Sequence, residues 1–320
     1  GAEGGTSAAG ISNNAKMTAQ GIPREKEIRS LFQMAYDGET LEGGDFDAFE
    51  VSILDAVYKD PQLHRDLLSG NKIASLIGSL FYNIPPEEIN KTKATTNDLY
   101  TRAKNGFFAW IYGAYISKIA KVVNLTVEET ESGISKLIKK YPTIHIYREL
   151  LKSRFSPLIQ EGGIGSRVEW RKPDEYIESI LGFKRHFTLE WSVTYGLFEL
   201  SNNPPSEWKD IRGECRRTNR PQTICGATQS ALYNAAFALQ GAVFRAAANH
   251  EIQSPGAQIT KNLQRNIWDL QPQGINPWVV RPLNIHDEVL CVRDASVNPQ
   301  NGSLEHVQNV DVFTLVQKRL

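Results

Sequence analysis

The sequence of 320 residues predicts an α+β fold in which helices dominate and a few short strands occur near the two ends. Two observations support this fold class. Apolar residues recur with helical spacing through most of the chain, and short apolar runs at each end have the pattern of strands. One of these strands ends at Asp45, and two others flank His286-Asp287-Glu288.

Helices account for most of the predicted elements. Pro61 breaks the first of them, Pro85-Pro86 ends the second, and Thr95-Thr96-Asn97-Asp98 starts the third. The predicted helices lie, in chain order, at 49–68, 72–81, 99–123, from Asn124-Leu125-Thr126 to about Lys140, 143–159, 227–268 with an interruption at Pro255-Gly256, and 303–320. Residues 166–222 show no clear pattern, although they contain three tryptophans.

The overall charge is balanced, with 36 basic and 36 acidic residues, which argues mildly against an extended polyanionic partner. Positive charge nevertheless gathers locally, in residues 136–154 and at Arg212, Arg216, Arg217 and Arg220. Each cluster fits either a solvated face or a phosphate-binding track. No apolar run reaches about 18 residues, so no membrane span is expected. Three cysteines fit neither a zinc site nor a disulfide framework and favour a reducing compartment.

The acids near the two ends are the first candidate site. The adjacent carboxylates of Asp287 and Glu288 lie in an apolar run, where they are costly to bury, and a bound divalent cation would relieve that cost. Asp45 has a similar setting about 240 residues earlier in the chain. Acids of this kind suggest a composite metal site, as two-metal phosphoryl transfer requires.

Two rows of residues at helical spacing are further candidates. Lys104, Phe108 and Tyr112 follow at i, i+4 and i+8, which suits a triphosphate beside a base, although for this row alone an amphipathic helix with core aromatics is the favoured interpretation. Arg245, Asn249 and Gln253 have the same spacing. This second row could contact nucleic acid without demanding a sequence, or could simply face solvent.

Together these segments resemble the polymerase domain of family A DNA polymerases. Seven segments occur in the family's order: Gln20-Gly21-Ile22-Pro23, Asp45 to Glu50, Lys104 with Phe108 and Tyr112-Gly113, Tyr141-Pro142, Leu181 to Arg185, Arg245 with Asn249 and Gln253, and His286-Asp287-Glu288. The resemblance implies a palm, built from a small antiparallel sheet with helices, and mostly helical fingers.

The resemblance also implies roles for individual residues. Asp45 and Asp287, helped by the backbone carbonyl of Phe46, would hold two Mg²⁺ ions, with Glu288 beside them. Lys104 would bind the triphosphate and donate a proton to the leaving group. Glu50 would be the steric gate against ribonucleotides, Phe108 would lie by the incoming nucleotide, and Tyr112 would guard the templating position. Four further residues would contact primer-template DNA: Arg245, Asn249, Gln253 and His286.

The implied organisation is 1–65 palm, 66–226 fingers with an insertion at 186–226, and 227–320 palm. The resemblance implies that the family's thumb and exonuclease domains are absent from this stretch. Primer-template DNA and dNTPs are the expected partners, no membrane is involved, and a processivity factor is left open. The expected location is the cytoplasm of a bacterium or of a phage-infected host cell. The chain departs from the family pattern at Gly5 and Tyr100, where the family has arginines.

Two other functions remain possible on the sequence alone. A DNA-binding fragment with weak or no catalysis would fit the missing arginines, but it would have no need of paired acids. A metal-dependent nuclease would use clustered acids as well, but it would not need the row formed by Lys104, Phe108 and Tyr112.

Overall fold

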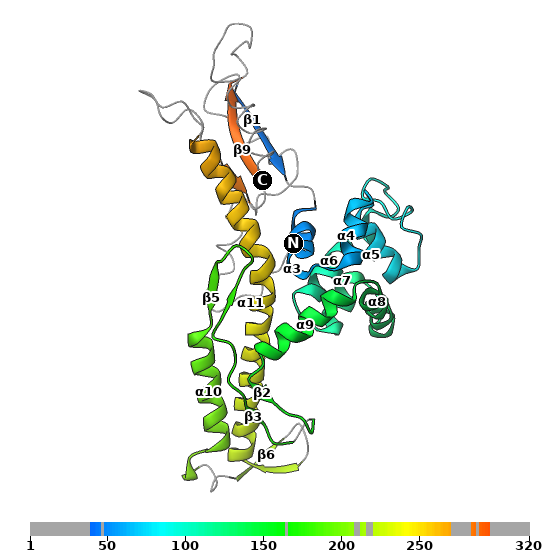
Figure 1. Ribbon diagram of the computed structural model, residues 1–320. Coiled ribbons are helices and arrows are strands. Elements are labelled where there is room, and N and C mark those ends of the chain that lie inside the picture. Colours follow the sequence, from blue (N-terminus) through cyan, green and yellow to red (C-terminus); the bar gives the residue numbers. More distant parts are fainter. Residues whose placement is uncertain are drawn as a thin grey trace, which may run out of the picture. The chain divides into compact units, whose positions relative to one another are not determined.

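The computed structural model describes the backbone of residues 39–45, 48–163, 166–207, 212–215, 220–269, 283–285 and 288–294. Side chains are described for 48–163, 166–207 and 226–266. The chain divides into two compact units, one formed by Gly1–Phe49 with Gly256–Leu320 and the other by Glu50–Pro255. Helices predominate and the strands form small antiparallel sheets, which confirms the α+β class (Figure 1).

The first unit contains a three-stranded antiparallel sheet in the order β1-β9-β8. Its strands are β1 (Glu39–Asp45), β8 (Leu283–Ile285) and β9 (Glu288–Asp294). Asp45 pairs with Glu288, and Glu288 also pairs with Ile285 across the β8–β9 hairpin. The strand predicted to end at Asp45 is therefore confirmed, and it is a sheet neighbour of the strand that begins at Glu288.

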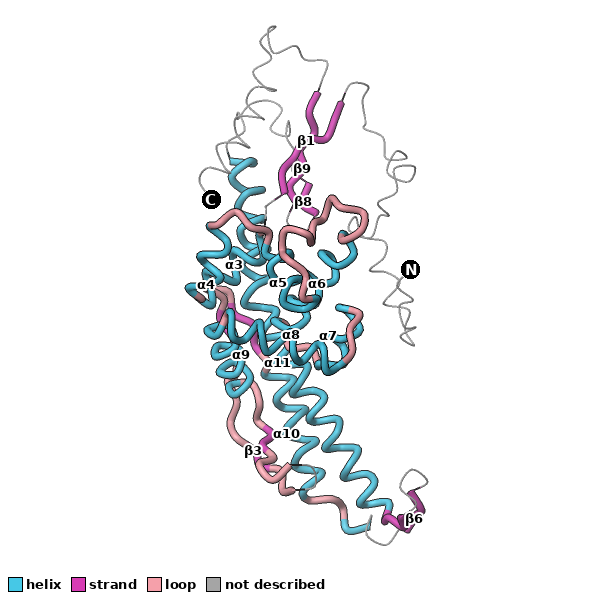
Figure 2. Tube along the Cα trace, turned by 90° about the vertical axis from the view of Figure 1, so that its right-hand side faces the viewer, coloured by secondary structure: helices cyan, strands magenta, loops and turns pink. Residues whose placement is uncertain are grey.

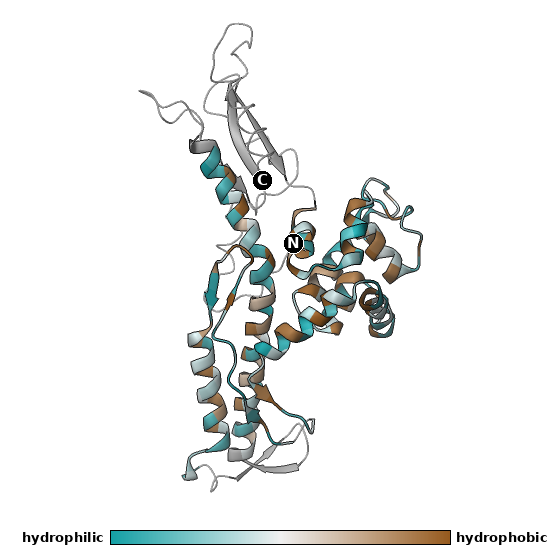
Figure 3. Cartoon of the chain, in the orientation of Figure 1, coloured by the Kyte–Doolittle hydropathy of each residue, from teal (hydrophilic) through white to brown (hydrophobic). Residues whose placement is uncertain are grey.

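The second unit is mainly helical. The helices of the chain are α3 (Phe49–Tyr58), α4 (Pro61–Leu68), α5 (Ile73–Tyr82), α6 (Asn97–Ile111), α7 (Ile116–Val123), α8 (Val127–Lys140), α9 (Pro142–Arg154), α10 (Thr188–Asn202) and α11 (Ile224–Asp269). Apolar and polar residues alternate along helices α4 to α9, as amphipathic helices around a core require (Figure 3). The last residues of α11 belong to the first unit.

Local signals set the helix boundaries that the sequence predicts. The Asp60 side chain accepts hydrogen bonds from the backbone N–H groups of Gln62 and Leu63, and Pro61 occupies the first turn of α4. Proline is tolerated there because its missing N–H would have no partner inside the helix. Thr126 and Glu129 form a reciprocal capping box at the start of α8. The predicted break at Pro61 and the predicted helix start at Asn124-Leu125-Thr126 are both confirmed.

The single helix predicted at 99–123 is wrong, because the chain turns between α6 and α7. Tyr112 is the C-cap of α6, and Gly113 has φ of +79°, a conformation that L side chains rarely adopt. A Cβ on Gly113 would lie 2.5 Å from the ring carbon Cε1 of Phe244 in α11. Glycine therefore permits both the turn and the close approach of α11.

Three other expectations also need correction. Helix α9 ends at Arg154 rather than 159, because Leu158–Ile159 form strand β2, which pairs with β3 (Glu169–Trp170). Helix α10 lies inside the stretch 166–222, where the sequence shows no clear pattern. The helical pattern is obscured because α10 buries Trp191 and Phe198 but also exposes other apolar side chains. Helix α11 continues through Pro255, so the interruption predicted there is absent; proline removes only one backbone hydrogen bond donor.

A hairpin and a helix pair complete the second unit. Strands β4 (Tyr176–Glu178) and β5 (Lys184–His186) form a hairpin that contains the segment Leu181 to Arg185, one of the seven that resemble the family. Helix α10 packs along α11 through a core that includes Trp191, Val243 and Ala247, and both views show the two helices side by side (Figures 1 and 2). A second cluster, with Phe198 and Ala236, continues the contact.

Replacing Gly113 with alanine should lower the free energy of unfolding by about 3 kcal/mol, from left-handed backbone strain together with the clash against Phe244. Gly70→Ala is the matched control, because Gly70 has φ of +76° but no atom within 4 Å of an added Cβ. It should cost only about 1 kcal/mol. Urea denaturation of both variants measures the difference, and equal losses would contradict a close approach of Phe244.

Candidate functional site

Three residues from distant parts of the sequence meet in one hydrogen-bonded group. Gln253 of α11 donates a hydrogen bond from Nε2 to Glu50 Oε1, at the start of α3. It donates a second to the Tyr112 hydroxyl at 3.0 Å, and that hydroxyl lies 3.5 Å from the same Glu50 oxygen. The second unit therefore brings together three of the residues singled out from the sequence.

The hydrogen-bonding direction in this group follows from its chemistry. Burial, and then the negative charge of Glu50, raise the pKa of the Tyr112 phenol. The phenol therefore keeps its proton near neutral pH and can donate it to Glu50 while accepting from Gln253. With two donors directed at one oxygen, the Glu50 carboxylate is held in place rather than free to rotate.

The aromatic part of the predicted row adjoins this group. The Phe108 and Tyr112 rings stack with centroids 5.9 Å apart, and Phe108 is 9% exposed. Lys104 lies one helical turn before Phe108 and is exposed. Phe108 and Tyr112 thus form a stacked aromatic pair, and Lys104 provides a solvated cation on the preceding turn of α6.

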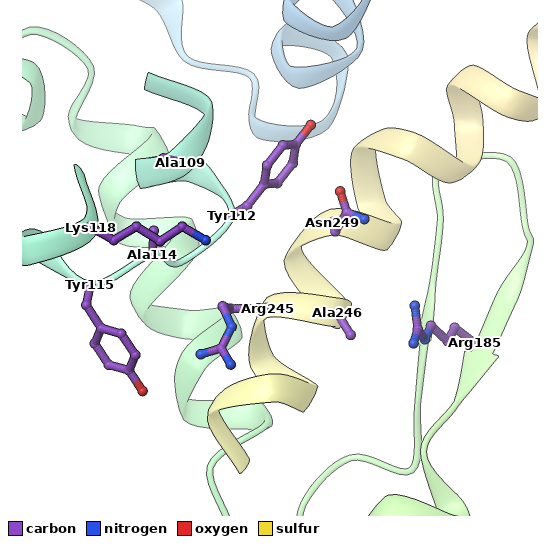
Figure 4. A pocket seen from close by; sticks show the side chains of 9 residues that line it. All are labelled: Ala109, Tyr112, Ala114, Tyr115, Lys118, Arg185, Arg245, Ala246 and Asn249. Atoms are coloured by element: carbon purple, nitrogen blue, oxygen red, sulfur yellow. The ribbon is translucent and has the colours of Figure 1, made fainter. Parts of the chain in front are cut away.

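A pocket of about 610 Å³ opens beside Tyr112 (Figure 4). It is lined by Ala109, Tyr112, Ala114, Tyr115, Lys118, Arg185, Ala246, Arg245 and Asn249. The pocket contains the two predicted residues Arg245 and Asn249 and adds Lys118 and Arg185 as further cations. The guanidinium of Arg245 lies 5.8 Å from the centre of the Tyr115 ring, which is 66% exposed. Cations beside an accessible ring suit phosphate and a stacked base.

Sequence reasoning missed Tyr115, Lys118 and the pocket role of Arg185. Tyr115 and Lys118 belong to the turn and helix that follow Gly113, which the sequence pattern merges into one long helix. Arg185 belongs to the segment Leu181 to Arg185, for which the resemblance implied no role of its own. The left-handed glycine after Tyr112 is the signal that would have separated α7 and redirected these side chains.

A second polar group is buried next to the first. Glu251 is 4% exposed, and its Oε1 accepts a 2.5 Å hydrogen bond from the Tyr147 hydroxyl of α9. The Tyr147 ring packs against that of Tyr58, with centroids 4.6 Å apart. Within the described residues, Glu251 Oε2 and the Tyr58 hydroxyl are buried without a hydrogen-bond partner.

Burial disfavours the charged form of Glu251. Desolvation raises its pKa from 4.5 to about 7, against the opposing hydrogen bond from Tyr147 and the more distant charge of Arg154. Burial likewise lowers the pKa of Arg148, whose guanidinium stacks on the Trp110 ring at 4.6 Å. A protonated Glu251 can itself donate a hydrogen bond, which an ionised one cannot.

The acids near the two ends of the sequence belong to the first unit. The register places Asp45 opposite Glu288, at the end of β9 that adjoins His286-Asp287. Phe46, His286 and Asp287 lie outside the described residues, and so do the side chains of Asp45 and Glu288. Among the side chains that the structure describes, no group of three or more His, Cys, Asp or Glu residues could hold a metal ion.

Comparisons with known proteins found a family match over part of the chain and a solved structure of similar fold. The family model described as DNA polymerase family A matches residues 7–163. No curated protein matches this chain. Among solved structures, the POL domain of Pol1 from M. smegmatis, in complex with DNA primer-template and dNTP, matches with a TM-score of 0.57 and 17% sequence identity. The match covers 94% of this chain but only 42% of that one, and it establishes similarity of fold. None of the helices in the described part of the chain is long and apolar enough to cross a membrane.

The raised pKa of Glu251 makes stability depend on pH. Its contribution to stability is fully present below pH 4.5 and is lost as the pH rises toward 7, because folding opposes ionisation there. At about 1.4 kcal/mol per pH unit, the loss is about 3 kcal/mol. Urea denaturation from pH 4.5 to 8 measures it, and Glu251→Gln should flatten this part of the profile. An unchanged profile in Glu251→Gln would contradict the assignment.

Proposed function

We propose that this chain is a member of DNA polymerase family A, whose model matches residues 7–163, and that it carries out template-directed DNA synthesis by transferring a nucleotide from a dNTP to a primer 3′-hydroxyl. The observation that carries this proposal is the meeting of Glu50, Tyr112 and Gln253 in one hydrogen-bonded group. Each was assigned a role in nucleotide or DNA binding from a separate sequence motif. A helical scaffold with no such role has no reason to hold them together.

Asp45 and Asp287, with the backbone carbonyl of Phe46, are the residues that would hold two Mg²⁺ ions. The donor set fits, because all three ligands are oxygens, which Mg²⁺ prefers. The pairing of Asp45 with Glu288 supports this assignment, since it places one acid beside the hairpin that carries the other. When bound, the ions would lower the pKa of the 3′-hydroxyl and neutralise the pyrophosphate. Glu288 would contribute additional negative charge at the same hairpin.

The incoming nucleotide is proposed to bind residues of α3 and α6. Lys104 would pair with the triphosphate and donate a proton to the leaving pyrophosphate. Phe108 would present its ring to the sugar and base. Glu50 would exclude a ribose 2′-hydroxyl, because a carboxylate held by Tyr112 and Gln253 cannot move aside without losing hydrogen bonds.

Primer-template DNA is the proposed macromolecular partner. Arg245, Asn249 and Gln253 lie on successive turns of α11 and supply donors suited to phosphate, sugar or base-edge acceptors. His286 is proposed to contact the primer end. The pocket beside Tyr112 would add Lys118 and Arg185 as phosphate contacts and Tyr115 as a stacking surface.

The palm and fingers assignment remains a proposal, with residues 1–65 and 227–320 as palm and 66–226 as fingers. The cytoplasm of a bacterium or of a phage-infected cell is the proposed location. A metal-dependent nuclease is less well supported, because hydrolysis does not require the Glu50, Tyr112 and Gln253 group. A DNA-binding fragment without catalysis would be distinguished from a polymerase by the primer-extension assay.

Asp287→Ala should abolish primer extension, with a loss of at least about 10³-fold in rate, because it removes a proposed metal ligand. The assay extends a labelled primer on a longer template with Mg²⁺ and all four dNTPs. Asp294→Ala, at the opposite end of β9, is the matched control and should extend normally. Because catalysis can require residues beyond these 320, a longer polypeptide that includes adjoining sequence is assayed beside this chain. Degradation without extension would favour the nuclease, and DNA binding with neither activity would favour the binding fragment.

Glu50→Ala should raise ribonucleotide incorporation relative to deoxynucleotide incorporation by at least about tenfold, equal to about 1.4 kcal/mol of discrimination. Single-nucleotide incorporation with matched ATP and dATP measures the ratio. Glu131→Ala, an exposed acid on α8, controls for the loss of one negative charge. An unchanged ratio in Glu50→Ala would refute the role of Glu50 in sugar selection.

A further inference from the structure

Glu251 belongs to a buried polar cluster that the proposed chemistry does not use. Its side chain is buried in α11, and its Oε1 accepts the hydrogen bond from the Tyr147 hydroxyl of α9. The Tyr147 ring packs on the ring of Tyr58, which is buried at the last residue of α3. Three helices of the second unit therefore meet at one buried carboxyl group.

This cluster shares two helices with the group formed by Glu50, Tyr112 and Gln253. Helix α3 carries Glu50 in its first turn and Tyr58 at its end, about 12 Å further along the helix axis. Helix α11 carries both Glu251 and Gln253, which are about 200° apart around its axis. Because these two side chains project from nearly opposite sides, α11 is held at two separate points. A movement of α11 that breaks the contact of Glu251 also displaces Gln253.

We propose that Glu251 and Tyr147 are positioning residues for Glu50, because their contact holds α11 where Gln253 donates its hydrogen bond to the Glu50 carboxylate. The exclusion of a ribose 2′-hydroxyl then depends on a buried contact away from the nucleotide. Both residues act through the backbone of α11 and not by touching the substrate. The inference rests on the proposed function, since it takes the sugar selection assigned to Glu50 as one of its readouts.

Unpaired atoms make this contact dependent on protonation. Glu251 Oε2 and the Tyr58 hydroxyl are buried without a hydrogen-bond partner among the described residues. A protonated Glu251 is neutral, accepts from Tyr147 through Oε1 and carries a proton that it can donate. An ionised Glu251 is a buried negative charge with one hydrogen bond, and its solvation requires water to enter beside α11. The protonated carboxyl group is therefore the form that holds α11 in place.

The surroundings of Glu251 set the pH at which this change occurs. Titratable groups of the cluster come from α3, α6 and α9: Tyr58, Tyr112, Tyr147, Arg148 and Arg154. Burial raises the pKa of each of the three phenols, which remain neutral near pH 7. Burial of Glu251 outweighs the hydrogen bond from Tyr147 and the charge of Arg154, and raises the pKa of this carboxyl group to about 7. Glu251 therefore changes its charge near neutral pH.

Sugar selection in Tyr147→Phe, which removes the hydroxyl and keeps the ring, tests the positioning role. The preference for dATP over ATP in single-nucleotide incorporation should fall by at least about threefold, because one hydrogen bond contributes a factor of about three to ten. Tyr82→Phe is the matched control, since the half-buried Tyr82 hydroxyl donates to the Val123 carbonyl at 2.9 Å. It should destabilise the chain similarly and leave the preference unchanged. A wild-type preference in Tyr147→Phe would overturn the proposal.

The preference for dATP should also depend on pH in the wild-type chain. It should be highest well below pH 7 and fall as the pH rises through about 7, because Glu251 loses its proton there. Ionisation of the primer terminus and of the triphosphate affects both nucleotides and cancels in the ratio. Glu251→Gln imitates the protonated side chain and should keep the high preference across this range. A Glu251→Gln profile that falls as the wild-type profile does would contradict the role of Glu251.

A double-mutant cycle tests the positioning role without catalysis. Urea denaturation gives the unfolding equilibrium constants of Tyr147→Phe, Gln253→Ala and the double variant, whose effects should depart from additivity by at least about fivefold. Tyr82→Phe combined with Gln253→Ala should be additive within about twofold. Additivity of Tyr147→Phe with Gln253→Ala would refute the positioning role. If the wild-type chain does not extend primers, the proposed function fails and the cycle alone decides whether Tyr147 positions Gln253.

Discussion

The packing of helix α11 against the rest of the second unit is the constraint on which the candidate site depends. Phe244 can approach the α6–α7 turn because Gly113 has no side chain. About two turns further along α11, Glu251 meets Tyr147 of α9, and about half a turn beyond that Gln253 meets both Glu50 and Tyr112. Because all these contacts are made by one helix, displacing it at any of them moves the others. The site is therefore specified by a shared helix rather than by a local loop.

Polar groups that are half-buried or buried make this packing selective. Glu50, Tyr112 and Gln253 satisfy one another, whereas Glu251 and Tyr58 each retain an unpaired buried oxygen among the described residues. An apolar interface tolerates small shifts, but the geometry of a hydrogen bond is lost within about an ångström of movement. A satisfied group therefore fixes the position of α11, and a partly satisfied one beside it makes that position sensitive to protonation.

The sequence was informative where a pattern is local and poorly informative where tertiary contacts decide. The caps at Asp60 and Thr126, and the strand ending at Asp45, follow from residues within a few positions. The row of Lys104, Phe108 and Tyr112 identified relevant residues, but helical spacing alone could not show that Tyr112 ends its helix. That ending depends on Gly113 and its contact with Phe244, about 130 residues away. Helical periodicity likewise cannot show that Glu50 and Gln253 are hydrogen-bonded to each other. Helix α10 was not predicted from the sequence because apolar residues occupy both its buried and its exposed faces.

Helix α11 is longer than the candidate site requires, and its extra length has a physical cause. The residues from Arg245 to Gln253 occupy little more than two turns, whereas the helix has 46 residues. The preceding turns contain the fully buried Ala236 and the buried Val243, and α10 covers this face. Without α10 these side chains would face water, and α10 in turn has its buried face only because α11 continues. The two helices therefore form one structural unit that extends beyond residue 226.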